Sequence, residues 1–407
     1  MKNSTPLLSV HDALATLLLA ATKNTISEFS QSPTLSANGR VLAADITAPV
    51  NVPGADNAQM DGYALNSVDA TKKIPLLISQ RIAAGHVGTP LQPGTAAQIF
   101  TGAIIPSGAD TVVMQEQCEV LETSEGSAVR LLHTPKAGEW VRRVGEDICQ
   151  DSVILTAGTR LRAQELGLAA SVGLATLPIK RRLKVAIFFT GDELVMPGEP
   201  LPAGAIYNSN RFLLTALLEN SGCEIHDFGV VPDTLEATRA ALKKAAQASD
   251  VVITSGGVSV GEEDHIKPAM QAEGRLNLWQ IAVKPGKPLA FGEIGSAFFL
   301  GLPGNPVSSF VTFLVFVRPF LLRLQGVANV MPTSFSMRAD FSWQKADARN
   351  EFLRVKLNAD GGLDLFPNQG SAVLSSVVWG DGLVDNPPGT KITPGDLVKF
   401  IPFSELI

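Results

Sequence analysis

The residues best suited to chemistry in this chain form a glycine-rich run that leads into acids. The run 254–261 reads Thr-Ser-Gly-Gly-Val-Ser-Val-Gly and is followed by two glutamates and Asp264. Glycine lets backbone amides approach an anion, and clustered carboxylates suit a hard cation such as Mg²⁺. The run therefore predicts a phosphate-facing loop at Ser255, Gly256 and Gly257. The alternative is a tight strand-to-helix turn in which the glycines only supply positive φ angles.

The acids around this run are candidates for holding the metal. Asp250 precedes the strand that ends in the glycine run, and Asp264 follows the run. Asp264 could instead cap the helix that runs toward Met270. Asp192 and Glu193 come just after the apolar segment 185–189, where an acid is costly unless it is solvated or paired. We therefore expect a site role for at least one of the two.

A lysine turn and a proline-opened helix suit an oxyanion. The segment 284–288 reads Lys-Pro-Gly-Lys-Pro, so a rigid turn fixes the ammonium groups of Lys284 and Lys287. The alternative is a solvated loop whose lysines have no ligand. The segment 301–306 then opens a helix with proline in its first turn, with Ser308 just after it. A helix N-terminus is itself an anion site.

Three glycine turns in the first 150 residues also carry an acid or a hydroxyl. They hold Asp61, Thr101 and Asp147, and each alone is ordinary turn chemistry. The five histidines show no ligand spacing, and each is better explained as a structural or surface residue.

Composition limits the partners of this site. A net charge of -6 with 18% charged residues argues against nucleic acid, which requires a basic face. The apolar segment 307–317 is too short to span a membrane, so a buried helix is the better interpretation. Three scattered cysteines suggest neither disulfides nor a zinc site. The apolar segment 14–21 lacks the basic flank of a signal peptide, so we expect a cytoplasmic protein.

The elements that must position these residues fall into successive blocks. Short apolar runs between glycines and prolines predict a β-rich block over 41–151, either barrel-like or sandwich-like. Between 183 and 325, strands alternate with helical patterns, which predicts a parallel sheet covered on both faces. The polar motifs follow three of these strands, so we expect them at the carboxyl edge of the sheet. From 331 onward, alternation at 352–357 and 373–378 predicts strands of a small β domain.

Taken together, these motifs resemble those of the molybdopterin molybdenumtransferases, the family that includes gephyrin and plant E domains. The similarity covers almost the whole chain, in order, through seven segments: 60–64, 101–103, 145–148, 190–194, 254–264, 284–288 and 301–306. The resemblance implies an enzyme of molybdenum cofactor biosynthesis that takes adenylylated molybdopterin and molybdate, inserts the metal and releases AMP. It also implies Mg²⁺ that assists cleavage of the pyrophosphate bond.

The resemblance also implies roles for individual residues. Mg²⁺ would be held by Glu193, Asp250 and Asp264. The phosphates of the substrate would contact Ser255, Gly256, Gly257, Asp250, Pro303 and Pro306. Molybdate would contact Lys284, Lys287, Ser308, Arg349 and Ser371. The catalytic set would be Asp61, Thr101, Asp147, Glu193 and Asp264.

The architecture that the resemblance implies is multidomain, α/β plus β, and dimeric. We expect a helical dimerisation region at 1–44 plus 152–180, a β-rich lobe at 45–151, and a central three-layer α/β/α domain with a mostly parallel sheet at 181–326. A small barrel-like β domain would follow at 327–407. In the homodimer, Asp61, Thr101 and Asp147 of one subunit would complete the cleft of the other. Contacts with molybdopterin adenylyltransferase and molybdoenzyme maturation factors are a further expectation.

One departure from the family pattern and two rival functions remain. Gln280 follows Trp279 where relatives carry a basic residue, so we expect altered ligand affinity. The first rival is a molybdopterin adenylyltransferase, whose single domain shares the pattern of 183–325. The second is a non-catalytic scaffold for cofactor assembly.

Overall fold

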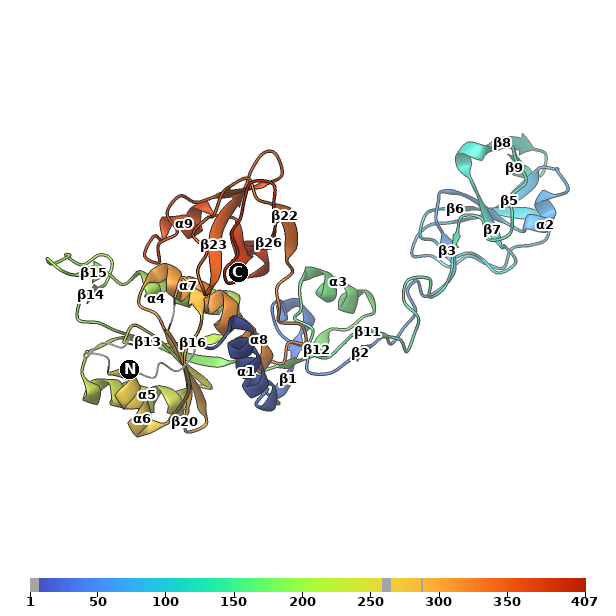
Figure 1. Ribbon diagram of the computed structural model, residues 1–407. Helices are drawn as coiled ribbons and strands as arrows, with labels where there is room; N and C mark the ends of the chain where they lie inside the picture. Colours follow the sequence, from blue (N-terminus) through green and yellow to red (C-terminus); the bar gives the residue numbers. More distant parts are fainter. Residues whose placement is uncertain (1–6, 258–264, 287) are drawn as a thin grey trace.

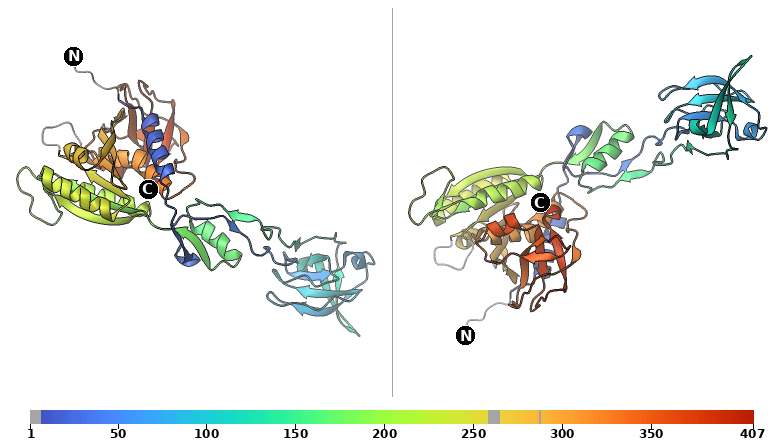
Figure 2. Two further views of the ribbon diagram at one scale, coloured as in Figure 1. Left: turned by 90° about the horizontal axis from the view of Figure 1, so that it is seen from below. Right: turned by 90° about the horizontal axis from the view of Figure 1, so that it is seen from above.

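The computed structural model describes residues 7–257, 265–286 and 288–407. The molecule is elongated, with a large body at one end and a β-rich lobe at the other (Figure 1). Two chain segments form the stalk that joins them, and the lobe stands clear of the large body in all three views (Figures 1 and 2). The large body contains an α/β unit and a C-terminal β domain.

The α/β unit is built on a sheet with the strand order β16-β13-β17-β21-β20-β18 within the described residues. The first four strands are parallel, β20 runs antiparallel to them, and β18 is antiparallel to β20 and so runs in the direction of the first four. The strands are β13 (Lys184–Thr190), β16 (Glu224–Val231), β17 (Val251–Ser255), β18 (Arg275–Gln280), β20 (Pro288–Ile294) and β21 (Ala297–Leu302). A short parallel pair lies beside it, β14 (Leu194–Val195) and β15 (Ile206–Tyr207).

Helices cover both faces of this sheet because its strands are apolar on both sides. Along β13, Ala186 and Phe188 pack with α5 (Leu235–Ala248) and α6 (Ile266–Glu273). Alternate residues such as Ile187 face the opposite layer. That layer contains α1 (Val10–Lys23), α4 (Ser209–Asn220), α7 (Pro306–Thr312), η3 (Phe313–Val317) and α8 (Arg318–Leu324). Successive side chains of a strand point to opposite faces of the sheet. Because both sets are apolar here, helices pack on both faces and the unit has three layers.

Helix α1 does not belong with residues 152–180, and our grouping of the two was wrong. Its buried face, with Ala13, Leu17 and Ala21, joins the core of the α/β unit. Ser9 caps the helix by accepting a hydrogen bond from the Asp12 N–H. The apolar stripe of an amphipathic helix indicates that one face is buried, but not against which partner.

The apolar segment after Pro306 is a core helix. Residues Pro306–Leu324 are long and apolar enough to cross a membrane by composition, yet 83% of that window is buried inside the protein. Its phenylalanines pack on the sheet, and Phe320 makes edge contacts with Phe291 and Phe298. The burial agrees with the interpretation made from the sequence.

The stalk is formed where the chain leaves the large body and returns to it. Strand β1 (Phe29–Pro33) pairs with β12 (Thr176–Lys180), and β2 (Ile46–Thr47) pairs with β11 (Val153–Leu155). Helices η1 (Thr34–Ser36) and α3 (Ala163–Ser171) pack here around a small core that includes Leu42, Leu161 and Leu177.

The lobe contains one mixed sheet with the order β7-β4-β6-β5-β9-β8. Its strands are β4 (Gly62–Leu65), β5 (Leu76–Ile82), β6 (Thr95–Ile99), β7 (Thr111–Met114), β8 (Cys118–Thr123) and β9 (Gly126–Leu131). Around the sheet lie β3 (Asn57–Ala58), β10 (Val141–Arg142), α2 (Ser67–Ala70) and η2 (Gln115–Gln117). Two apolar clusters lie on its two faces, and all their members come from within residues 58–141.

The C-terminal domain shares a strand and a core with the α/β unit. Its sheet has the order β19-β23-β25-β26-β22, with β24 beside β23. The strands are β19 (Val283–Lys284), β22 (Phe335–Arg338), β23 (Asn350–Leu357), β24 (Leu363–Leu365), β25 (Gly382–Asn386) and β26 (Leu397–Pro402), followed by η4 (Phe403–Glu405). Strand β19 comes from the lysine turn of the α/β unit and pairs in parallel with β23.

One predicted strand of this domain is a helix. Residues 373–378 alternate in polarity, but Ser375–Trp379 forms α9. The Ser376 hydroxyl donates to the Val373 carbonyl and accepts from the buried Arg354 guanidinium. This tertiary contact overrides a short alternating pattern, which is a weak indicator of strand over six residues.

Candidate functional site

A cleft of about 920 Å³ lies at the carboxyl ends of β13, β17 and β21. It brings together nine residues that the sequence predicted for substrate, molybdate or metal. They are Glu193, Ser255, Gly256, Gly257, Pro303, Pro306, Ser308, Arg349 and Ser371. The last two come from the C-terminal domain, so the cleft lies between that domain and the sheet edge.

The glycine turn is tightly packed against the end of β13. A Cβ added to Gly256, whose φ is +97°, would lie 2.6 Å from the Thr190 carbonyl oxygen. A Cβ on Gly257, whose φ is +64°, would lie 2.9 Å from Ile266 Cγ1 and from Thr190 Oγ1. Both positions therefore require glycine for conformation and for space.

Ser255 uses its hydroxyl to join the loops of the cleft. It is 3% exposed, donates to the Pro303 carbonyl at 2.9 Å and accepts from Asn210 Nδ2 at 2.8 Å. The Gly256 N–H also has a partner, the Leu302 carbonyl at 3.2 Å. Contact of these two donors with a phosphate would require them to exchange their present partners.

Asn210 is a cleft residue that the sequence reasoning missed. Its amide donates to both Ser255 Oγ and the Gly304 carbonyl, at 2.8 and 2.7 Å, and so ties together the turns after β17 and β21. The available signal was the Asn-Ser-Asn sequence at 208–210, because Asn208 caps α4. That pattern indicates a helix start, but it does not indicate which loops the second asparagine reaches.

The loop that carries Ser371 is anchored at two points. The Val307 N–H, at the start of α7, donates to the Ser371 carbonyl at 3.0 Å. Arg354, 1% exposed, donates to the carbonyls of Phe352 and Gly370. Burial lowers the pKa of Arg354 to about 10. The buried guanidinium thus fixes the backbone next to Ser371.

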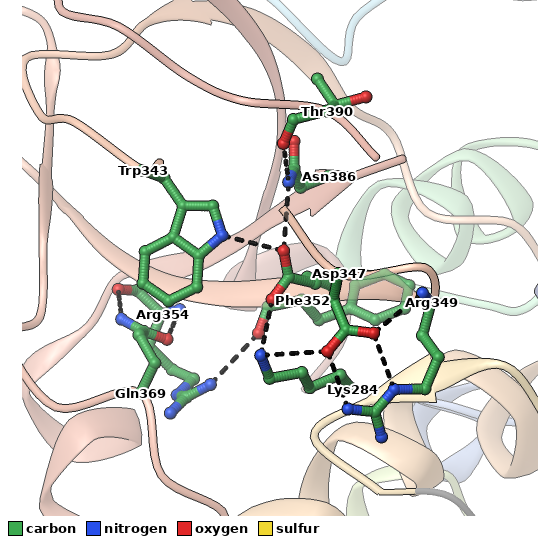
Figure 3. A network of polar contacts seen from close by, with 10 residues as sticks. Lys284, Trp343, Asp347, Arg349, Phe352, Arg354, Gln369, Asn386 and Thr390 are labelled. Carbon is green, nitrogen blue, oxygen red and sulfur yellow. Dashed lines mark hydrogen bonds and ion pairs between the residues drawn. The ribbon is translucent and has the colours of Figure 1, made fainter. Parts of the chain in front are cut away.

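Lys284 lies at the junction between the two domains and is paired with acids. Its Nζ is 2.9 Å from Glu351 Oε1 and 3.4 Å from Asp347 Oδ2 (Figure 3). The side chain of Glu351 is 1% exposed and also accepts from Trp343 Nε1 and Asn386 Nδ2. Since β19 pairs with β23, the predicted oxyanion-binding lysine belongs to the C-terminal sheet as well as to the α/β unit.

Arg349 is also paired, although its side chain lines the cleft. Asp347 accepts from Arg349 Nε at 3.0 Å and from Nη2 at 2.8 Å. The hydrogen bonds from Arg349, together with its charge and a hydrogen bond from Lys284, hold the pKa of Asp347 far below its usual range despite some burial. The same pair raises the pKa of Arg349.

Asp250 is not in the cleft, and the role we expected for it as a ligand of metal and phosphate is a mistake. It lies before β17, at the opposite edge of the sheet, whereas the glycine turn follows that strand. Its carboxylate makes a two-pronged pair with Arg181, at 2.8 and 2.9 Å, and accepts from the Lys184 N–H. Five residues of strand span about 17 Å, which is too far for a shared ligand.

The lobe, which carries Asp61 and Thr101, stands clear of the large body of the same chain (Figures 1 and 2). Asp61 Oδ1 accepts from both the Thr101 hydroxyl and the Thr101 N–H, at 2.7 and 2.8 Å. The hydrogen bonds from Thr101 lower the pKa of Asp61. Asp147 is exposed and donates its backbone N–H to the Val52 carbonyl.

The described residues do not by themselves provide a complete metal centre. Among them, no group of three or more histidine, cysteine or acidic side chains could hold an ion. Glu193 and Asp233 are the carboxylates in the described lining of the cleft. Asp264, like Lys287, lies outside the described residues, so their predicted roles remain predictions.

Three family models match successive parts of the chain. The model described as the MoeA N-terminal region (domain I and II) matches residues 8–173, and a probable molybdopterin binding domain matches 186–323. The MoeA C-terminal region (domain IV) matches residues 336–403.

Individual proteins match over almost the same length. The chain is 40% identical to a protein of Haemophilus influenzae named molybdopterin molybdenumtransferase, over 91% of this chain and 93% of that one. It is 37% identical to a protein of the same name from a Nostoc species, over 83% and 79%. A crystal structure of a MoeA molybdopterin biosynthesis protein from Pyrococcus horikoshii superposes with a TM-score of 0.83 at 28% identity, covering 98% of this chain and 100% of that one.

Proposed function

The chain belongs to the molybdopterin molybdenumtransferase family, enzymes of molybdenum cofactor biosynthesis, and we propose which residues carry that reaction. The substrates in this proposal are adenylylated molybdopterin and molybdate, and the products are the molybdenum cofactor and AMP. One cleft is lined both by the glycine turn at the sheet edge, which suits a phosphate, and by Arg349 and Ser371 of the C-terminal domain. The proposal rests on this observation.

The sheet edge is the place for the pterin phosphate and the nucleotide. The glycine turn and the start of α7 approach each other here, and a Cβ on Gly304 would lie 3.8 Å from the Cα of Gly256. Pro303 and Pro306, on either side of Gly304, also line the cleft. Glycine backbone lets a ligand come close to the main-chain amides, which suits a phosphate better than a bulky apolar group.

The domain junction is the place for molybdate. Arg349, Ser308 and Ser371 line the cleft, and the Lys284 ammonium contacts the same carboxylate as Arg349, that of Asp347, in the network of Figure 3. A guanidinium and hydroxyl groups can donate several hydrogen bonds to a tetrahedral oxyanion. We assign Lys287 to the same site because it belongs to the same turn.

Mg²⁺ would arrive with the substrate. Its chemistry would be to neutralise the pyrophosphate oxygens, and an ion carried on phosphates needs only one or two protein carboxylates. Glu193 is the described residue that we assign to it, since it lines the cleft next to the glycine turn. Asp264 is our second candidate, because it closes the same glycine-rich run.

A second subunit would supply the missing side of the cleft. Asp61, Thr101 and Asp147 lie on a lobe that its own chain holds away from the cleft (Figures 1 and 2). A twofold dimer would bring each lobe to the cleft of its partner. The stalk around residues 29–44 and 152–180 would form the interface. We also expect a cytoplasmic enzyme that meets molybdopterin adenylyltransferase and molybdoenzyme maturation factors.

Release of AMP tests this function. Purified protein with adenylylated molybdopterin, Mg²⁺ and molybdate should form AMP and a cofactor that activates a molybdenum-free molybdoenzyme. Arg349→Gln should lose most of this activity because its guanidinium no longer meets the oxyanion. Reactions without protein give the background, and AMP formation no faster than that background would refute the proposal.

A further inference from the structure

Asp347 accepts hydrogen bonds from the guanidinium of Arg349, the group that would bind an oxyanion. Both carboxylate oxygens of Asp347 accept from the guanidinium, from Nε at 3.0 Å and Nη2 at 2.8 Å. The Lys284 ammonium is 3.4 Å from one of the same oxygens (Figure 3). A carboxylate of the protein therefore lies where two of the predicted oxyanion-binding cations converge.

The two carboxylates of this network are held very differently. The side chain of Glu351 is 1% exposed and bonds to Trp343 and Asn386 in addition to Lys284. The side chain of Asp347 is 23% exposed, and its side-chain contacts among the described residues are with Arg349 and Lys284. Asp347 can therefore rotate toward solvent without leaving a buried acid unpaired, whereas Glu351 cannot.

The charges of the network balance in the observed arrangement. Two cations, Lys284 and Arg349, face two carboxylates, Asp347 and Glu351. An oxyanion that approached Arg349 with Asp347 in place would meet a like charge on the same guanidinium. Like charges at such short range are strongly unfavourable in a partly desolvated site. The oxyanion and the carboxylate must therefore exchange.

We propose that Asp347 is a built-in competitor for the oxyanion, exchanging with it on Arg349 and Lys284. Asp347 weakens oxyanion binding and returns to Arg349 as the oxyanion is transferred. Asp347 thereby lowers affinity but aids turnover, because molybdate must leave this site to reach the dithiolene. The inference rests on the proposed function for the identity of the oxyanion.

The opposite role for Asp347 has an opposite consequence. If Asp347 only orients Arg349 for the ligand, then removal of its charge releases the guanidinium and binding becomes weaker. If Asp347 competes, the same change makes binding tighter. The sign of the effect therefore separates the two roles.

Direct binding of molybdate to Asp347→Asn measures that sign. Sodium molybdate alone is titrated into the full-length protein by calorimetry, without adenylylated molybdopterin. We expect a Kd about tenfold lower than that of the wild type, as loss of one partly exposed charged pair allows. Sulfate should gain about as much, because a competitor for the guanidinium affects any tetrahedral dianion.

Asp340→Asn is the matched control. Asp340 makes the same two-pronged contact with an arginine two residues away, Arg338, at 2.7 and 3.0 Å in the same domain. It does not belong to the described lining of the cleft. We expect its Kd for molybdate to remain at the wild-type value, and both variants to keep the wild-type melting temperature within a few degrees.

Two further measurements make the inference easy to refute. In an Arg349→Gln background, Asp347→Asn should no longer tighten binding, since the competed group is gone. In turnover, Asp347→Asn should lower the KM for molybdate and also lower kcat. Equal or weaker molybdate binding by Asp347→Asn, or no binding by either protein, overturns the inference. Failure of AMP release with tightened binding refutes the proposed function instead.

Discussion

The C-terminal domain and the lobe are attached to the α/β unit in opposite ways. Four residues of the C-terminal domain, Phe352, Leu383, Ile401 and Leu406, belong to the main core of the α/β unit. The lobe keeps both of its clusters to itself and connects through a stalk. Arg349 and Ser371 are therefore fixed to the sheet edge by a shared core, whereas the position of the lobe residues depends on the stalk.

Removal of the C-terminal domain should have the largest effect on the α/β unit. A chain that ends at Ser334 loses the four shared core residues, each of which stabilises by about 2 kcal/mol, or about 8 kcal/mol together. That approaches the whole stability of a typical domain, so we expect no cooperative unfolding of the α/β unit. The isolated lobe, residues 45–151, should instead unfold in one cooperative transition. Circular dichroism during thermal unfolding measures both.

Two observations would contradict these expectations. If the truncated chain melts cooperatively at the temperature of the full-length protein, the shared core does not couple the two units. If the isolated lobe is unfolded, its two clusters are not sufficient, and the apolar cluster that joins Ala48 and Ile148 to Val172 of the stalk is required.

Subunit mixing tests whether the lobe acts on the cleft of a partner. Asp61→Asn keeps an oxygen that can accept from Thr101 but removes the negative charge, and we expect AMP release to fall about 100-fold, as loss of a catalytic acid does. Arg349→Gln disables the other half of the site. Unfolded and refolded together, the two inactive variants should recover about a quarter of wild-type activity, because one cleft of each mixed dimer is intact.

Two controls define what this experiment means. Each variant refolded alone should stay inactive, and light scattering should show that both remain dimers. If mixing restores nothing while mixed dimers form, the lobe does not act in trans. In that case Asp61 and Thr101 form an ordinary turn, as their sequence alone permits.

Two glycines, one in the cleft and one in the lobe, differ in how closely their neighbours pack. Gly256 and Gly102 both have positive φ, +97° and +81°, but only Gly256 is crowded, with the Thr190 carbonyl 2.6 Å from an added Cβ. For Gly102 nothing lies within 4 Å. We expect Gly256→Ala to cost about 2–3 kcal/mol of unfolding free energy, and Gly102→Ala about 1 kcal/mol. Urea denaturation measures both, and equal costs would mean that crowding at the cleft turn relaxes freely.

Much of the α/β unit could be predicted because its signals are local. The predicted alternation of strands and helices over 183–325 is present in the structure, for example in α5 at Leu235–Ala248 and β21 at Ala297–Leu302. The positions of the glycine turn and the proline-opened helix follow from strand direction, since parallel strands end at one edge. Most of the cleft was therefore predictable from order along the chain.

What the sequence did not show for α1, α9 and Lys284 concerns contacts between segments that are distant in sequence. The partner of α1, the anchoring of α9 by Arg354, and the pairing of Lys284 with Glu351 depend on tertiary packing. A cluster of cations in the sequence gave no indication that carboxylates 60 or more residues away would neutralise it. For Asp250 the signal was present, because an acid before a parallel strand lies at the amino edge.

Substitution of Asp250 should have the smallest effect, and it tests whether this residue lies outside the cleft. Asp250→Asn weakens the pair with Arg181 at the amino edge of the sheet. It should cost about 1 kcal/mol of unfolding free energy. AMP release should keep the wild-type rate because the substitution lies at the edge of the sheet opposite the cleft.

The unfolding free energy lost in Asp250→Asn should decrease as the pH falls. Burial of Asp250 raises its pKa, but hydrogen bonds from Arg181 and the Lys184 N–H, with the charges of both residues, outweigh burial and lower the pKa overall. A carboxyl whose folded pKa is depressed stabilises above its unfolded pKa and loses that contribution as pH falls through the folded value. The difference between wild type and Asp250→Asn should therefore be complete above about pH 4 and shrink below it. A variant that loses AMP release at neutral pH while keeping its stability would instead return Asp250 to the site.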